Sequence, residues 1–171
     1  NSAYYPHALY AGALIAYLLH DTPYALSETT LHNLKQGLLT FRFFCAGLDV
    51  PAGTVGRFPK GQQILETLLP AFAYTALSFK EPDKELTAAF KRILESSDNK
   101  QAITEYISNV NSNLAYTSTV GEIELMAQLA STSITKEKTV TGTLFMPYSG
   151  LLVAKDSLFH FNIKGFSRYI W

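Results

Sequence analysis

The sequence has one cysteine, no excess of either charge and no long apolar run, and each shortage excludes a class of protein. Cys45 is the only cysteine among 171 residues, which excludes an internal disulfide and a cysteine-based metal cluster. The 14 Lys and Arg residues balance 14 Asp and Glu residues, so the chain lacks the basic excess that nucleic-acid binding requires. No apolar run approaches the roughly 20 residues of a membrane span. We therefore expect neither nucleic acid nor a membrane as a partner.

Several motifs with a defined chemistry are also missing. The chain has no Walker-type or G-x-G-x-x-G nucleotide loop and no G-x-S-x-G nucleophile elbow. No pair of carboxylates has a spacing that suggests a glycosidase, and we expect Glu122 and Glu124 to be solvated. The four histidines show no metal-ligand spacing, and His160 is expected to face outward from a strand. The sequence therefore predicts no metal site and no cofactor.

The first part of the chain has the pattern of helices. Residues 8–20 are apolar on all sides, which predicts a helix buried all round that ends before Pro23. Ser27 is expected to cap the next helix, where apolar residues recur at helical spacing up to Cys45, a buried inert thiol. Further helices are expected at 61–79, where Pro70 kinks or splits the helix, at 82–95, at 100–110 and at 122–129.

From about Ile134 the period changes to that of strands. Residues 139–145 are rich in β-formers, residues 151–154 form a short apolar run, and apolar residues alternate with polar ones over 159–164. Lys155-Asp156 is expected to form a hairpin turn, and Gly150 a turn or bulge. The chain is thus α+β, helices first and then an antiparallel sheet that is only begun, whose missing strands we expect beyond Trp171.

Two features could carry chemistry. Arg57 is the single arginine of a loop at 50–59, bracketed by Gly and Pro between two expected helices. A fixed guanidinium suits a carboxylate or a sulfate, and a solvated loop arginine is the alternative. Tyr4, Tyr5 and Tyr10 cluster at the start, where aromatic rings suit stacking on sugars, although a core role is more common.

An ordered set of motifs resembles a known family. Leu18-Leu19-His20-Asp21-Thr22-Pro23, then residues 33–35 (Asn-Leu-Lys), then 56–59 (Gly-Arg-Phe-Pro), and near the end 147–150 and 164–171, resemble polysaccharide lyase family 8, in the branch of the chondroitin sulfate ABC lyases. The likeness spans both ends of the chain and is loose over about 83–135. It implies an α+β multidomain fragment: the C-terminal part of an incomplete α/α toroid at 1–135, followed by the first strands of an antiparallel β-sandwich at 136–171.

The resemblance also implies a reaction. Lyases of this family cleave uronate-containing glycosaminoglycans by β-elimination, and the products carry a C4–C5 double bond. Tyr4 matches the position of the catalytic tyrosine, with Tyr5 as the residue that a shift of one would choose, and Arg57 matches the catalytic arginine. We expect Tyr5 and Phe58, beside these two, to contact the substrate.

The chain departs from the family's pattern at both ends. The family's catalytic histidine would lie before Asn1, its asparagine further upstream, and its glutamate beyond Trp171. The expected partners are therefore an anionic polysaccharide and the rest of the same polypeptide, the expected location is secreted or periplasmic in a bacterium, and we expect the piece alone to be inactive. Two alternatives stay open: a non-catalytic carbohydrate-binding or scaffold segment, and a hyaluronate- or xanthan-preferring member of the family.

Overall fold

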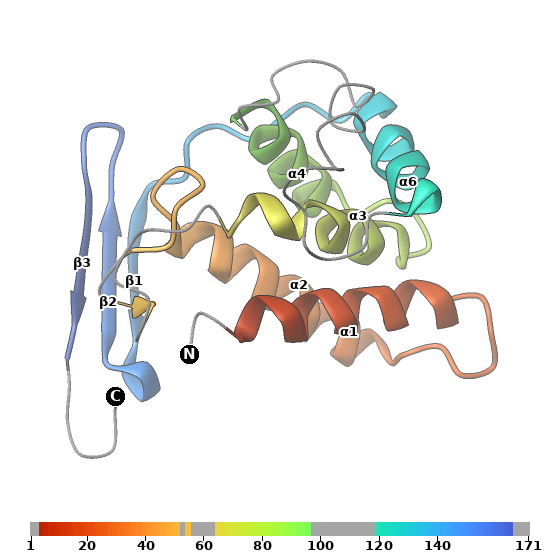
Figure 1. The fold of residues 1–171 in the computed structure, drawn as a ribbon, viewed down its shortest axis with the longest axis horizontal. Coiled ribbons are helices and arrows are strands. Elements are labelled where there is room, and N and C mark those ends of the chain that lie inside the picture. The colour runs from red at the N-terminus through yellow and green to blue at the C-terminus, as the bar shows by residue number, and fades with distance from the viewer. Residues whose placement is uncertain (1–3, 52–53, 56–63, 97–118, 166–171) are drawn as a thin grey trace.

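The chain is mostly helical, with a small sheet at its C-terminal end (Figure 1). The computed structural model describes residues 4–51, 54–55, 64–96 and 119–165. In chain order the elements are α1 (Tyr5–Leu19), α2 (Glu28–Phe44), the 3-10 helix η2 (Glu66–Leu68), α3 (Leu69–Leu77), α4 (Lys84–Ser96), α6 (Val120–Ser131), β1 (Gly142–Met146), the 3-10 helix η3 (Pro147–Ser149), β2 (Leu151–Lys155) and β3 (His160–Lys164). The α+β class is confirmed.

Local sequence signals start several of the helices. The Ser27 hydroxyl accepts the Thr30 N–H at 3.3 Å at the start of α2. The Asp83 carboxylate accepts the Leu86 N–H at 2.9 Å at the start of α4. A side-chain oxygen at this place satisfies a backbone N–H that the helix itself cannot pair. Both predicted starts are confirmed for this reason.

The predicted third helix is wrong in extent. Residues 64–65 form a turn, η2 follows, and the α-helix begins only at Leu69, with Pro70 in its first turn. Proline lacks the N–H that a helix interior needs, but the first turn does not use that group. Pro70 therefore starts α3 instead of bending a longer helix. Residues 61–63 and the helix expected at 100–110 lie outside the described residues.

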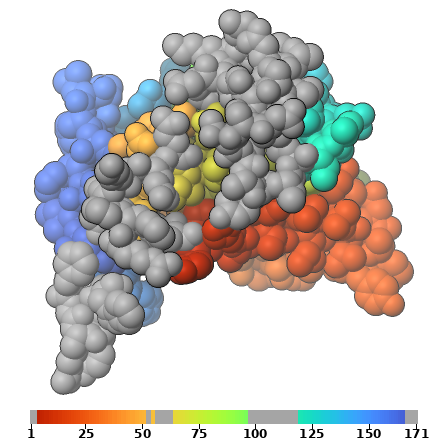
Figure 2. Space-filling view, viewed as in Figure 1, coloured from red at the N-terminus to blue at the C-terminus, as the bar shows by residue number. Residues whose placement is uncertain are grey.

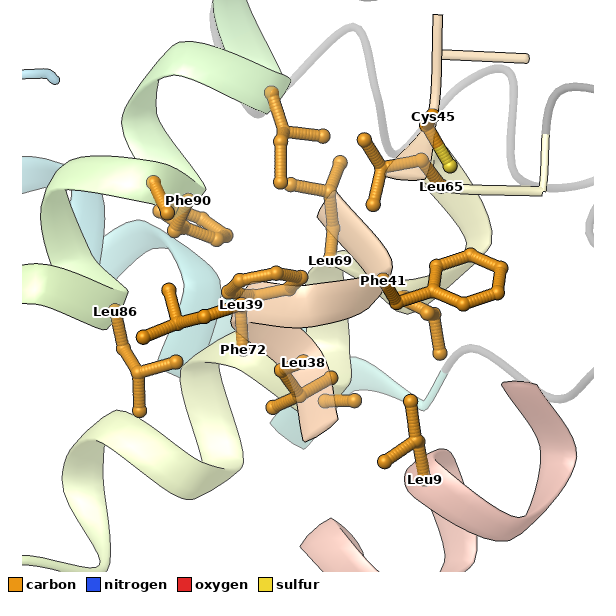
Figure 3. Packing of buried hydrophobic residues seen from close by; sticks show 14 of the residues in the cluster. Leu9, Leu38, Leu39, Phe41, Cys45, Leu65, Leu69, Phe72, Leu86 and Phe90 are labelled. Atoms are coloured by element: carbon orange, nitrogen blue, oxygen red, sulfur yellow. The ribbon is translucent and has the colours of Figure 1, made fainter. Parts of the chain in front are cut away.

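Helix α3 is the centre of the helical part. It packs against α1, α2, α4 and α6, and all its residues from Leu69 to Ala76 are buried. Figure 3 shows Phe72 of α3 among apolar side chains of α2 and α4, including Leu39, Leu86 and Phe90. Burying side chains of this size contributes about 1.5–3 kcal/mol each to folding. This core holds the helices, and through them the candidate site, in place.

Helix α1 is not buried all round, contrary to the prediction. Leu9, Ala13 and Ala16 are in the core, whereas Ile15 is half exposed and Leu18 is 64% exposed. The helix contacts α2 and α3 from one side. Among the described residues no element covers the opposite stripe, so its apolar residues remain at the surface.

The sheet is antiparallel in the order β1-β2-β3. Val153 in the middle strand pairs with Leu144 on one side and Asn162 on the other. The turn expected at Lys155-Asp156 is wrong by one residue, because Lys155 is the last residue of β2 and the Asp156 N–H donates to the Phe159 carbonyl at 2.9 Å. Gly150, with φ of +59°, forms the predicted turn between β1 and β2.

The residues on the inner and outer faces of the sheet are not those that the sequence predicted. His160 pairs with Lys155 across the strands, and Lys155 Nζ reaches back to the carbonyls of Phe43 and Cys45 at 3.1 and 2.9 Å. His160 therefore lies on the inner face, and its Nε2 is buried. Since side chains alternate, Phe161 takes the outer face, where Phe145 of β1 is 63% exposed. Buried Val153 and Leu151 decide this choice of face.

The segment between α6 and β1 is tied to the helices. The Glu137 carboxylate accepts hydrogen bonds from Arg42 of α2 and, at 2.7 Å, from Arg92 of α4. The Glu137 N–H also donates to the Ala88 carbonyl at 3.0 Å. Figure 2 shows the strands on one flank of the molecule and α1 reaching away from them. The domain boundary expected at 135/136 lies in this segment and stays a prediction.

Candidate active site

Tyr4 is the N-cap residue of α1. Its carbonyl accepts the Ala8 N–H at 3.3 Å, and Pro6 lies buried in the first turn of the helix. The fixed φ of proline suits that turn. The backbone of Tyr4 is therefore held by the helix, while its side chain is 60% exposed. A phenol on a fixed backbone at an open surface could exchange a proton with a bound molecule.

Tyr5, the next residue, packs its side chain against α2. Its ring lies 6.1 Å from the ring of Phe41 on α2, and its hydroxyl sits directly over Gly37 of the same helix. Burial raises the pKa of Tyr5 above its ordinary value. The Tyr5 hydroxyl is therefore less suited than an ordinary tyrosine to lose its proton. Tyr5 as a whole is 43% exposed, so part of the residue remains open to a ligand.

The N-terminus of α1 lies beside the C-terminus of α2, from which the arginine loop departs. Phe41, which contacts Tyr5, packs on Phe44 at 5.9 Å between ring centroids. Helix α2 ends at Phe44, and Ala46 pairs with Asp49 in a short bridge. The structure thus brings the two predicted tyrosines close to the start of the loop.

Both flanks of the loop are anchored in the core. Val50 and Val55 are buried, and the Thr54 N–H donates to the Pro51 carbonyl at 2.9 Å. On the far side the Leu65 N–H donates to the Leu48 carbonyl at 3.3 Å. Arg57 and Phe58 themselves lie outside the described residues. Their meeting with Tyr4 stays a prediction.

The sequence reasoning missed a buried carboxylate. Glu122 was expected to be solvated, but it is 2% exposed. It accepts the Tyr10 hydroxyl of α1 and, at 2.9 Å, the Thr119 N–H. Burial raises the pKa of Tyr74 on α3, and the neighbouring Glu122 carboxylate raises it further. The cause is that α6 packs against α3, which turns this side of α6 inward.

A local signal for this carboxylate was present. Thr119 and Glu122 have the spacing of a capping box, in which each side chain accepts the other residue's backbone N–H. That pattern predicts the start of a helix and a fixed glutamate, but not the burial. Glu124, on another side of α6, is exposed as predicted.

The cations at the junction of helices and sheet are already paired. Arg42 and Arg92 share Glu137, and Lys155 is bonded to two carbonyl oxygens. Burial and the neighbouring Arg92 and Arg42 lower the pKa of Lys155. These groups hold the junction together, and none of them points to a bound anion.

Three further findings concern the described residues alone. Cys45 is buried, as predicted, and burial raises the pKa of its thiol to about 12, so it stays protonated and unreactive. No three His, Cys, Asp or Glu side chains in this part of the chain gather as metal ligands would. None of its helices is long and apolar enough to cross a membrane.

Comparison with known proteins gives two relatives. Over 159 residues the chain is 28% identical to the "Chondroitin sulfate ABC exolyase" of Bacteroides thetaiotaomicron. This match covers 91% of the chain and 15% of the relative. Over 87 residues it is 29% identical to the "Chondroitin sulfate ABC endolyase" of Proteus vulgaris. This second match covers 50% of the chain and 8% of the relative. The chain therefore spans a small part of the length of both relatives. No solved structure matches it.

A family model described as "Lyase, catalytic" matches residues 2–100. This stretch contains α1 to α4, both tyrosines and the arginine loop. The part of the molecule from α1 to α4 is thus of the lyase catalytic class. The chain belongs to that lyase family, and with the two relatives this confirms the resemblance to chondroitin sulfate ABC lyases.

Proposed function

We propose that the chain is part of a polysaccharide lyase that acts on glycosaminoglycans. The substrates would be chondroitin or dermatan sulfate, with hyaluronan as a further candidate, and the products would carry a C4–C5 double bond. One observation carries the proposal: the match to the lyase catalytic family covers residues 2–100, which include Tyr4 and Arg57. The names of both relatives agree with this substrate class.

In the proposed reaction Tyr4 moves the proton. Its phenolate oxygen takes the proton from C5 of the uronate, the C5–H electron pair forms the C4=C5 bond, and the C4–O4 bond breaks. The phenol then returns the proton to the departing O4. Arg57 would favour the phenolate and stabilise charge at the leaving oxygen. We assign the base to Tyr4 because burial raises the pKa of its neighbour Tyr5, whose exposed part is left to contact the sugar, together with Phe58.

The rest of the site would come from outside this chain. We propose that the remaining polypeptide supplies a histidine, an asparagine and a glutamate, and that the complete enzyme is secreted or periplasmic, where it would meet its polymeric substrate. The helical part would belong to an incomplete α/α toroid and the strands to a β-sandwich. The exposed apolar side chains on the outer face of the sheet, among them Phe145 and Phe161, support the sandwich, because a second sheet would cover such a face.

The test uses the full polypeptide that contains this chain, with chondroitin sulfate as substrate. Elimination is followed by the ultraviolet absorbance of the unsaturated uronate. Tyr4→Phe should lower kcat by about 10²- to 10⁴-fold, the usual contribution of a general acid–base group, and Arg57→Ala should abolish turnover.

Tyr24→Phe is the matched control. It makes the same chemical change on an exposed tyrosine beyond the other end of α1, and should leave kcat unchanged. Retained activity in Tyr4→Phe would remove Tyr4 from the mechanism. Binding of the polysaccharide without any elimination by the unmutated protein would instead support the non-catalytic carbohydrate-binding alternative.

A further inference from the structure

Helices α1 and α2 are in close contact at a glycine. A Cβ atom on Gly37 of α2 would lie 2.8 Å from the Tyr5 hydroxyl and 2.9 Å from Leu9 Cδ2, both on α1. Ordinary contact begins at 3.4 Å, so a methyl group here would displace the Tyr5 hydroxyl by about 0.6 Å or turn its ring. Any residue other than glycine at position 37 would therefore displace the Tyr5 and Leu9 side chains with which the first turns of α1 contact α2.

Each of the two helices contributes two residues to the contact. Tyr5 and Leu9 are four residues apart on α1 and share one face, and Gly37 and Phe41 have the same relation on α2. The Tyr5 ring contacts Phe41 at a centroid distance of 6.1 Å. In Figure 3, Leu9 projects from α1 toward the part of α2 that carries Leu38 and Phe41. The side chains of Tyr5 and Leu9 thus hold the start of α1 against α2.

The backbone of Tyr4 has little freedom to move independently of this contact between α1 and α2. It is bonded directly to Tyr5, its carbonyl pairs with the Ala8 N–H, and Pro6 restricts the turn between them. Its exposed side chain therefore takes its position from the turn that Tyr5 anchors. A displacement of the Tyr5 ring would be passed on to the Tyr4 phenol.

We propose that Gly37 and the Tyr5 ring form a seat that positions Tyr4 for proton transfer, so that Gly37 is a positioning residue of the active site although it touches no substrate. The proposal rests on the proposed function, in which Tyr4 is the base. It assigns to Tyr5 a second role beside contact with the sugar. Catalysis is sensitive to such placement, since about 1 Å of misplacement costs up to about 100-fold in rate.

The test compares Gly37→Ala, Tyr5→Phe, the double variant and Gly12→Ala in the full polypeptide, by kcat, KM and thermal unfolding. Gly12→Ala is the matched control: it is the same change in the same helix pair, where the added Cβ would meet only Leu34 Cδ1 at 3.4 Å. Gly37→Ala should lower kcat by roughly 10- to 100-fold with little change in KM. Gly12→Ala should keep the kcat of the unmutated protein.

The double variant separates positioning from a general loss of structure. Tyr5→Phe removes one of the two atoms that a methyl group on residue 37 would strike, and Leu9 Cδ2 at 2.9 Å remains. In that background Gly37→Ala should therefore cost clearly less in kcat than in the unmutated protein, a coupling expected only for residues in contact. A wild-type kcat in Gly37→Ala, an undiminished loss in the Tyr5→Phe background, or an equal loss in Gly12→Ala would each overturn the proposal.

Failure of the seat and failure of the proposed function give different results. If the unmutated protein is inactive, or Tyr4→Phe is active, the proposed function fails. If Tyr4→Phe is inactive while Gly37→Ala is unimpaired, only the seat fails. Should Gly37→Ala not fold, Tyr5→Leu tests the same seat: loss of positioning lowers kcat, whereas loss of sugar contact alone raises KM and would overturn the proposal.

Discussion

Replacing Glu122 by alanine should destabilise the protein strongly, although Glu122 lies outside the proposed catalytic group. The carboxylate is buried and accepts hydrogen bonds from the Tyr10 hydroxyl and the Thr119 N–H. Hydrogen bonds to a charged group contribute about 1.5–3 kcal/mol each. The two bonds together suggest a loss near the lower end of their sum, about 3 kcal/mol, because alanine also relieves the cost of burying a charge. Typical domains have only about 5–15 kcal/mol in total.

The substitution acts at three helices at once. Tyr10 belongs to α1, Tyr74 to α3, and Thr119 precedes α6, so the loss of one side chain leaves the Tyr10 hydroxyl without this acceptor and removes the carboxylate that neighbours Tyr74. Glu122→Gln keeps an oxygen that can complete the capping box. It should therefore cost less, about 1 kcal/mol. The order Ala, then Gln, then unmutated protein is the signature of a hydrogen-bonded carboxylate.

Urea unfolding followed by circular dichroism measures these differences in the free energy of unfolding. Glu124→Ala is the control, because Glu124 is an exposed glutamate on the same helix, and its loss should change stability by less than about 0.5 kcal/mol. A Glu122→Ala variant within about 0.5 kcal/mol of the unmutated protein would refute the reasoning.

Two further predictions concern the junction of helices and sheet. Glu137→Ala leaves the buried Arg42 without its carboxylate and should cost about 3–5 kcal/mol in urea unfolding, whereas Glu95→Ala, in an exposed pair, should cost less than about 1 kcal/mol; equal costs would contradict this account. Burial and the neighbouring Lys155 lower the pKa of His160 below 6.5, so the unfolded chain binds a proton more readily and stability falls as the pH falls through 6.5. His160→Asn should reduce the loss of stability between about pH 8 and about pH 5, and an unchanged loss would count against burial of the imidazole.

The helix starts show how far local chemistry reaches. Ser27 caps its helix as predicted, and Asp83 lies at the predicted start of the fourth helix, because an N-cap contact involves residues only two or three apart in the chain. Pro70 was expected to kink or split a helix, but it lies in the first turn of α3. Proline is compatible with both places, and the tertiary packing of α3 decided between them.

Burial could not be derived in the same way. Glu122 and His160 were expected in solvent, but Glu122 is buried and His160 is partly buried, with its Nε2 away from water, while Leu18 was expected inside and lies at the surface. In each case the helix or strand that holds the residue was predicted, but which of its faces is buried depends on another element distant in the chain. For Glu122 that element is α3, and for the face of the sheet that carries His160 it is the end of α2, whose carbonyls bind Lys155.

For the candidate site, motif order pointed to Tyr4 and Arg57, and the family match covers both. The structure adds a physical difference between Tyr4 and Tyr5. The two are adjacent and chemically identical in the sequence, but one is exposed and the other rests on Gly37.

The sequence by itself determined the helix-then-strand order, the Ser27 cap, the turn at Gly150 and the family, because these depend on local spacing and on short ordered motifs. Only the tertiary structure decided which faces are buried, which carboxylate and imidazole are removed from water, and why a glycine on α2 matters to a tyrosine on α1. The physical reason is that burial and close approach are properties of pairs of elements, and neighbouring positions in the chain do not record which elements will meet.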